Sequence, residues 1–226
     1  MSIVYKLINK SILCQHEKIV AFDCFDTILS RKVSPEYVFK LWVKEFINFF
    51  DLKQKTEEIC AILDTVDHEK VKSISQLAKH LKDKLYIKKV NFIEILVQLM
   101  VNTECRVTYV NYEVYQLLSK AKQLNKKLIL ISDYYLPETQ LNQILKFHQL
   151  QNYFSKIFVS CDYNADKASG GLYKTILQKL NIKASDIIMI GDNINSDYRC
   201  AIQSVSYTHL KSEYLLRNAK HIVFCG

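Results

Sequence analysis

Short apolar runs that end in a carboxylate recur along this chain of 226 residues. Three have this form: IVAFD (Ile19–Asp23), LILISD (Leu128–Asp133) and IIMIGD (Ile187–Asp192). A fourth run, KIFVSC (Lys156–Cys161), leads directly into Asp162. Continuous apolar runs of this length are typical of strands that are covered on both faces, as in a parallel sheet.

Segments with helical periodicity separate these runs, at Tyr112–Lys126, Glu138–Leu150 and Tyr173–Leu180. Pro137 precedes the second segment at a position where a helix tolerates proline. Alternation of strands and helices predicts an α/β fold with a doubly wound parallel sheet. Such sheets bind ligands at the carboxyl ends of their strands, where the carboxylates of this sequence also lie.

The stretch from residue 32 to residue 106 has a different pattern. It begins with Ser34-Pro35-Glu36, a plausible helix start, and continues with apolar residues such as Val38, Trp42 and Phe46 at helical spacing. It contains no strand pattern. We therefore predict an all-helical cap at residues 32–106, inserted into a sheet domain formed by residues 1–31 and 107–226, and we assign the aromatic stripe to the core of the cap.

Residues with suitable chemistry gather at the predicted strand ends and in one polar loop. They are Asp23, Asp26 and Thr27 of the motif F-D-C-F-D-T, Ser132, Lys167, and Asp192 and Asp197 of the motif G-D-x4-D. Together they supply a carboxylate nucleophile, hydroxyl donors, a cation and further carboxylates. This equipment suits the binding of Mg²⁺ and the transfer of a phosphoryl group through an aspartyl phosphate.

In order and spacing these motifs resemble those of the haloacid dehalogenase (HAD) superfamily, and the match extends over nearly the whole chain. The resemblance implies a Rossmann-like sheet domain with a helical cap. It implies that Asp23 is the nucleophile and that Asp23 and Asp192 bind Mg²⁺ together with the backbone carbonyl of Phe25. Asp197 would support the metal ligands.

The same resemblance assigns the remaining candidates to the phosphoryl group. Ser132 and Thr27 would address phosphoryl oxygens or the loop of the nucleophile, and Lys167 would stabilise the group in transfer. Lys174 competes for the role of Lys167. We favour Lys167 because it precedes Ser169-Gly170-Gly171, whereas Lys174 is expected to lie on the next helix.

The first motif departs from the pattern of the family's phosphatases. These usually carry a second aspartate two residues after the nucleophile, which protonates the leaving group; here the position is Phe25, and Asp26 follows it. Loss of a positioned acid costs about 10²–10⁴ in rate. Three explanations stay open: Asp26 is the acid, the substrates have good leaving groups, or the chain binds phosphate with little turnover.

Two neighbours of this motif have other expected roles. Cys24 is expected to point into the core, since side chains alternate along a strand. Arg31 lies where the chain leaves for the cap, and a role at the hinge or surface competes with a contact to an anion.

Composition and charge restrict the function classes. Hydrophobic residues make up 49% and charged residues 24%, as in ordinary globular proteins. The net charge of +8 would suit nucleic acid, but the lysines form no basic arm, so nucleic acid is not an expected partner. Seven cysteines without CxxC spacing argue against a zinc site and a disulfide framework. The lack of a long apolar run argues against a membrane span. Together these features favour the cytoplasm.

The sequence thus predicts a Mg²⁺-dependent phosphatase that acts on a small phosphorylated substrate, and it leaves the oligomeric state open. The alternative is a catalytically weak phosphate-binding module, or a fragment of a larger biosynthetic protein.

Overall fold

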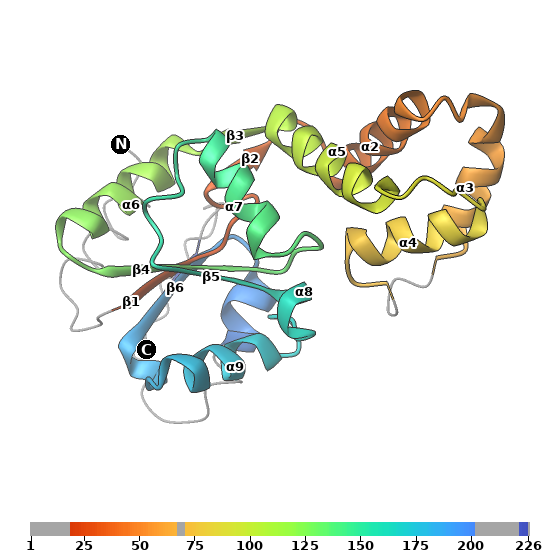
Figure 1. Cartoon of the computed structure of the whole chain (residues 1–226). Helices are drawn as coiled ribbons and strands as arrows, with labels where there is room; N and C mark the ends of the chain where they lie inside the picture. Colours follow the sequence, from red (N-terminus) through yellow and green to blue (C-terminus); the bar gives the residue numbers. More distant parts are fainter. Residues whose placement is uncertain (1–18, 67–70, 202–221, 226) are drawn as a thin grey trace.

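A five-stranded sheet forms the centre of one part of the protein, with helices packed around it (Figure 1). The structure, a computed structural model, describes residues 19–66, 71–201 and 222–225. The strand order is β5-β4-β1-β6-β7. The strands are β1 (Ile19–Phe22), β4 (Lys127–Ser132), β5 (Lys156–Val159), β6 (Ile187–Gly191) and β7 (Ile222–Cys225).

Four of these strands are parallel, which confirms the predicted α/β fold. β1 pairs with β4 and β6, and β4 pairs with β5, all in parallel register. The edge strand β7 runs antiparallel to β6, a common addition to an otherwise parallel sheet. In this one strand the sheet differs from the parallel sheet that the sequence predicts.

Side chains of the central strand β1 alternate between two apolar layers, as period-2 geometry requires. Val20 and Phe22 pack in one layer, together with residues of α6 (Tyr112–Gln123) and α7 (Glu138–Phe147). Ile19 and Ala21 pack in the other layer, against residues of α9 (Gly171–Leu180). Helices thus cover both faces of the sheet. Cys24 is fully buried in the first layer, in agreement with the core position expected for it.

The helices of the sheet domain follow the predicted alternation with shifted ends. They are α6 (Tyr112–Gln123), α7 (Glu138–Phe147), α8 (Ser160–Tyr163) and α9 (Gly171–Leu180), with the 3-10 helix η2 (Ala184–Asp186) and the π-helix η3 (Ile194–Arg199). α6 ends before the predicted Lys126 because Asn125 adopts a left-handed conformation, with φ of 56°. The predicted strand Lys156–Cys161 ends at Val159, because α8 begins at Ser160.

The chain leaves and re-enters the sheet domain through a small antiparallel pair, β2 (Leu29–Arg31) and β3 (Thr108–Val110). Between them the described residues form helices and no strand. These are α2 (Pro35–Phe49), the 3-10 helix η1 (Lys53–Lys55), α3 (Thr56–Asp64), α4 (Ile74–Lys84) and α5 (Phe92–Val107). Figure 1 shows α5 running from the strand pair into this helical cap.

The cap has apolar packing of its own. Trp42 of α2 is fully buried, and its indole N–H donates to the carbonyl of Leu96 on α5 at 2.8 Å. The aromatic stripe of α2 is thus part of the cap core. Ser34 caps α2 by accepting the N–H of Tyr37. No helix in the described part of the chain is long and apolar enough to span a membrane.

Candidate active site

A tight loop places Asp23 at the carboxyl end of the central strand. The N–H of Asp23 donates to the carbonyl of Ile190 at 2.8 Å, which continues the sheet by one residue beyond β1. The chain then turns, because the N–H groups of Ile28 and Leu29 both donate to the Cys24 carbonyl at 2.9 Å. This turn brings Thr27 back to the nucleophile candidate: its hydroxyl lies 3.1 Å from Oδ2 of Asp23.

The loop after β6 brings two further carboxylates to the same edge of the sheet. Oδ1 of Asp192 lies 3.2 Å from the Thr27 hydroxyl. Asp197 folds back over Gly191, where an added Cβ would meet Oδ2 of Asp197 at 2.2 Å. The absence of a side chain at Gly191 therefore allows this close approach. The N–H of Asn193 donates to Oδ2 of Asp197 at 3.1 Å and fixes its orientation.

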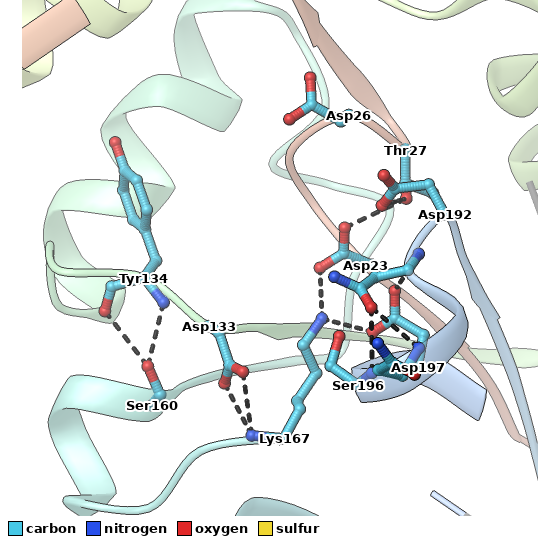
Figure 2. A network of polar contacts seen from close by, with 12 residues as sticks. Asp23, Asp26, Thr27, Asp133, Tyr134, Ser160, Lys167, Asp192, Ser196 and Asp197 are labelled. Carbon is cyan, nitrogen blue, oxygen red and sulfur yellow. Dashed lines mark hydrogen bonds and ion pairs between the residues drawn. The ribbon is translucent and has the colours of Figure 1, made fainter. Parts of the chain in front are cut away.

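Lys167 lies in a third loop, the polar loop predicted from the sequence, and bridges the loops of Asp23 and Asp197. Its Nζ lies 2.6 Å from Oδ1 of Asp23 and 2.6 Å from Oδ1 of Asp197 (Figure 2). Lys174, the competing lysine, lies on α9 with its side chain exposed. The structure thus brings Lys167, and not Lys174, to Asp23.

Sequence reasoning assigned no role to Asp133, although the structure places it beside this bridge. Its two carboxylate oxygens accept the backbone N–H of Lys167 at 2.9 and 3.0 Å. Asp133 therefore orients the loop that carries Lys167. A signal was available, because Asp133 ends one of the three apolar runs, in the same way as Asp23 and Asp192 do.

Ser132 and Asp26 lie at this edge with different surroundings. Ser132 ends β4 and is buried. Asp26 has a left-handed backbone, with φ of 60°. Its carboxylate points away from Asp23 in Figure 2 and pairs with Arg31 at 3.1 Å. The structure does not bring Asp26 to Asp23.

The three carboxylates of Asp23, Asp192 and Asp197, together with Lys167, are called the acidic cluster below. One oxygen from each carboxylate lies within 4.8 Å of the others, so the three could hold one metal ion. No backbone N–H of the described residues donates to the Phe25 carbonyl, the fourth predicted ligand, which leaves that oxygen available. An all-oxygen donor set of this kind suits Mg²⁺.

The charges of the acidic cluster are not balanced. Burial, and the negative charges of Asp197 and Asp192, raise the pKa of Asp23 to about 7 against the opposing effect of Lys167. Burial and Asp197 also raise the pKa of Asp192. Burial alone would lower the pKa of Lys167, but the two carboxylates it touches raise it, so the lysine stays charged. Three carboxylates around one ammonium group favour the binding of a further cation.

Fold and cluster together define the class: an α/β protein with a helical cap and carboxylates gathered at the carboxyl edge of its sheet. A family profile for haloacid dehalogenase-like hydrolases matches residues 17–204. The chain belongs to this family, which confirms the resemblance found in the sequence. No curated protein matches the chain significantly.

Solved structures share this fold at low sequence identity. A 2-haloacid dehalogenase from Pseudomonas syringae is 17% identical, with a TM-score of 0.62 and 83% of each chain covered. A HAD phosphatase from Thermococcus onnurineus is 21% identical, with a TM-score of 0.54 and 84% of each chain covered. The HAD-hydrolase YfnB from Bacillus subtilis, bound to magnesium, is 16% identical, with a TM-score of 0.52 and 84% of each chain covered. These similarities concern the fold alone.

Proposed function

We propose that this hydrolase is a Mg²⁺-dependent phosphatase that acts on a small phosphorylated compound, with Asp23 as the nucleophile. The observation that carries the proposal is the charge balance around Asp23, where three clustered carboxylates face Lys167 alone among the lysines and arginines of the described residues. Surplus negative charge on oxygen ligands favours a divalent cation and, with it, an anionic phosphoryl group.

In the proposed reaction a carboxylate oxygen of Asp23 forms a bond to phosphorus, while the bond between phosphorus and the leaving oxygen breaks. The leaving oxygen takes a proton from water or from an acid at the site. Water then attacks the aspartyl phosphate, which releases inorganic phosphate and regenerates Asp23. When bound, Mg²⁺ would neutralise charge on the phosphoryl oxygens.

The chain's own residues hold the nucleophile for this reaction. Lys167 fixes Oδ1 of Asp23 at 2.6 Å, and the Thr27 hydroxyl lies 3.1 Å from Oδ2, so the carboxylate has one orientation. We assign the Ser132 hydroxyl to a phosphoryl oxygen. Asp192, Asp197 and the Phe25 carbonyl would hold the metal with Asp23. The cap would limit the substrate's size and exclude water.

A second candidate function is phosphate binding with little turnover. Phe25, two residues after Asp23, favours it, because an apolar ring stands at this position. The ring packs 4.2 Å from the ring of Tyr134 and 4.0 Å from the guanidinium carbon of Arg31. This position therefore supplies no proton donor, and Asp26 is engaged by Arg31.

Phosphate release from aryl, acyl and alkyl phosphates, measured with Mg²⁺ and with excess EDTA, tests the proposal. Asp23→Asn is expected to lower turnover by about 10⁴- to 10⁶-fold. Asp64→Asn, which changes an exposed carboxylate on α3 of the cap, is the control and is expected to keep full activity. Undiminished turnover in excess EDTA would contradict the metal assignment.

Thermal melting gives a readout that is independent of turnover. Mg²⁺ at 100 times its dissociation constant is expected to stabilise the protein by about 2.7 kcal/mol, and Asp192→Asn is expected to reduce that gain. Binding of Mg²⁺ with beryllofluoride, but without phosphate release from any ester, would favour the second candidate. Chloride release from 2-chloropropionate without Mg²⁺ would contradict both candidates.

A further inference from the structure

A second group of buried charged side chains lies at the junction between cap and sheet domain. Glu104 of α5 is fully buried. Its Oε1 accepts the hydroxyl of Tyr134 at 2.7 Å, the hydroxyl of Tyr135 at 2.9 Å and Nη2 of Arg31 at 3.1 Å. Nε of Arg31 lies 3.4 Å from Oε2. These four residues are called the hinge cluster.

The hinge cluster joins three segments that are far apart in the sequence. Arg31 ends β2, where the chain leaves for the cap, and Glu104 lies in the last part of α5, just before the chain returns through β3. Tyr134 and Tyr135 directly follow Asp133 in the loop after β4. Both crossings between the domains are therefore tied to a loop of the candidate active site.

The hinge cluster also reaches the loop of the nucleophile. The guanidinium carbon of Arg31 lies 4.0 Å from the centre of the Phe25 ring, and the Phe25 ring lies 4.2 Å from that of Tyr134. Phe25 stands between Asp23 and Thr27 in the chain. Arg31 and Tyr134 thus enclose the side chain at the centre of the first motif.

Tyr135 gives the cap two further contacts to the same loop. Its carbonyl accepts the N–H of Ile74, the first residue of α4, at 3.0 Å. Its hydroxyl lies 3.7 Å from the sulfur of Met100 on α5. Movement of the cap relative to the sheet domain would therefore break contacts at both α4 and α5.

The hydrogen-bonding groups of the hinge cluster favour one arrangement. Burial raises the pKa of Tyr134 and that of Tyr135, so both phenols remain protonated donors to Glu104. A buried carboxylate without its donors is costly, so Glu104 and its three partner residues are expected to stay together.

We propose that Arg31 and Glu104 are positioning residues of the candidate active site. They hold the cap in one position relative to the sheet domain. Through Phe25 they fix the loop of Asp23. Through the Tyr134–Tyr135 pair they fix the loop in which Asp133 binds the N–H of Lys167. The consequence for catalysis rests on the proposed function, whereas the consequence for the two loops does not.

The test replaces both charges at once, in the double variant Arg31→Met with Glu104→Leu. Replacing a buried ion pair with apolar residues of similar volume is often neutral for stability, but here the hydroxyls of Tyr134 and Tyr135 also lose their acceptor. The melting temperature of the variant is therefore measured, which separates positioning from folding. Arg106→Gln is the matched control, because Arg106 lies two residues after Glu104 on α5, is largely exposed and forms an ion pair with the partly exposed Glu45.

Two readouts decide the proposal. In the double variant, assayed below its melting temperature, we expect kcat on a small aryl phosphate to fall by roughly 10- to 100-fold, because small misplacements of reacting groups carry penalties of this size. We also expect faster hydrogen exchange at the amides of Asp26 and Lys167, which bond to the Leu29 carbonyl and to Asp133. Amides of α2, inside the cap, should exchange as before.

Unchanged exchange at the Asp26 and Lys167 amides in a folded double variant would overturn the proposal. If no phosphate ester is turned over, the proposed function fails and the exchange readout alone decides. If the double variant does not fold, Tyr135→Phe replaces it, because it removes one hydrogen bond to Glu104 and keeps the ring. Faster exchange at the Lys167 amide in Tyr135→Phe supports the proposal, and unchanged exchange overturns it.

Discussion

The acidic cluster and the hinge cluster are both buried groups of charged side chains, but their charges are matched differently. In the hinge cluster the carboxylate of Glu104 has four N–H and O–H donors within 3.4 Å. In the acidic cluster Lys167 is shared between two carboxylates, and Asp192 has only the Thr27 hydroxyl as a side-chain partner among the described residues.

This difference indicates that the hinge cluster is complete without a ligand, whereas the acidic cluster is suited to bind a cation. A saturated buried ion pair gains little from any further ligand, and the loss of one of its two partners costs stability. A group with surplus carboxylates is itself destabilised, since like charges in a low dielectric repel each other. Binding of a cation would relieve this repulsion. Mg²⁺ should therefore stabilise the acidic cluster and have no effect on the hinge cluster.

In the comparison of the two clusters, the largest expected effect comes from removing the cation of the acidic cluster. Lys167→Met should lower turnover by about 10²- to 10³-fold, because it removes a preorganised charge beside the nucleophile. Without Mg²⁺ it should also destabilise the fold by roughly 3–5 kcal/mol, since the carboxylates lose their buried partner. Phosphate release and urea unfolding measure the two effects.

Mg²⁺ should restore much of the stability of Lys167→Met, because the metal replaces the lost positive charge, while turnover should stay low. Lys174→Met removes an exposed lysine of α9 and should change neither quantity. Activity close to that of the unmodified protein in Lys167→Met would remove Lys167 from the proposed mechanism.

A loss of stability without a response to Mg²⁺ is expected in the hinge cluster. Glu104→Gln leaves Arg31 nearly buried, with the half-exposed Asp26 as its remaining carboxylate, and should cost about 3–5 kcal/mol. Urea unfolding with and without Mg²⁺ should give the same difference from the unmodified protein. Arg106→Gln, which removes the exposed partner of an ion pair with the partly exposed Glu45, should cost about 1 kcal/mol or less. A Mg²⁺-dependent rescue of Glu104→Gln would break the distinction between the clusters.

The smallest expected effect is that of Asp26→Asn. Its side chain is about half exposed, so losing the pair with Arg31 should change stability by about 1 kcal/mol or less. Because the carboxylate points away from Asp23, turnover of aryl and alkyl phosphates should change little and to the same extent. A selective loss on alkyl esters, of about 10²-fold, would instead show that Asp26 turns toward the leaving group as its acid.

Much of the acidic cluster could be predicted from local patterns. Apolar runs that end at Asp23 and Asp192 indicate buried parallel strands, and the carboxyl ends of such strands meet at one edge of a sheet. Lys167 and Asp197 follow from motif order within the family. Ser132 also follows, since it ends a strand of the same sheet.

The hinge cluster could not be predicted in the same way, because its members come together only through the tertiary fold. Arg31 and Glu104 are 73 residues apart, with the whole cap between them. Their pairing depends on where the cap helices return the chain, and no local pattern contains that information. The sequence alone left a hinge role and an anion contact for Arg31 equally open.

The orientation of Asp26 and the role of Asp133 are tertiary results of the same kind. Asp26 faces Arg31 because its backbone turns through the left-handed region after β1, and Asp133 meets the N–H of Lys167 across two separate loops. Periodicity and strand ends determine which residues reach the edge of the sheet, because they depend on neighbours within a few residues. Which partner each side chain meets there is decided by contacts between distant segments, whose geometry only the folded chain sets.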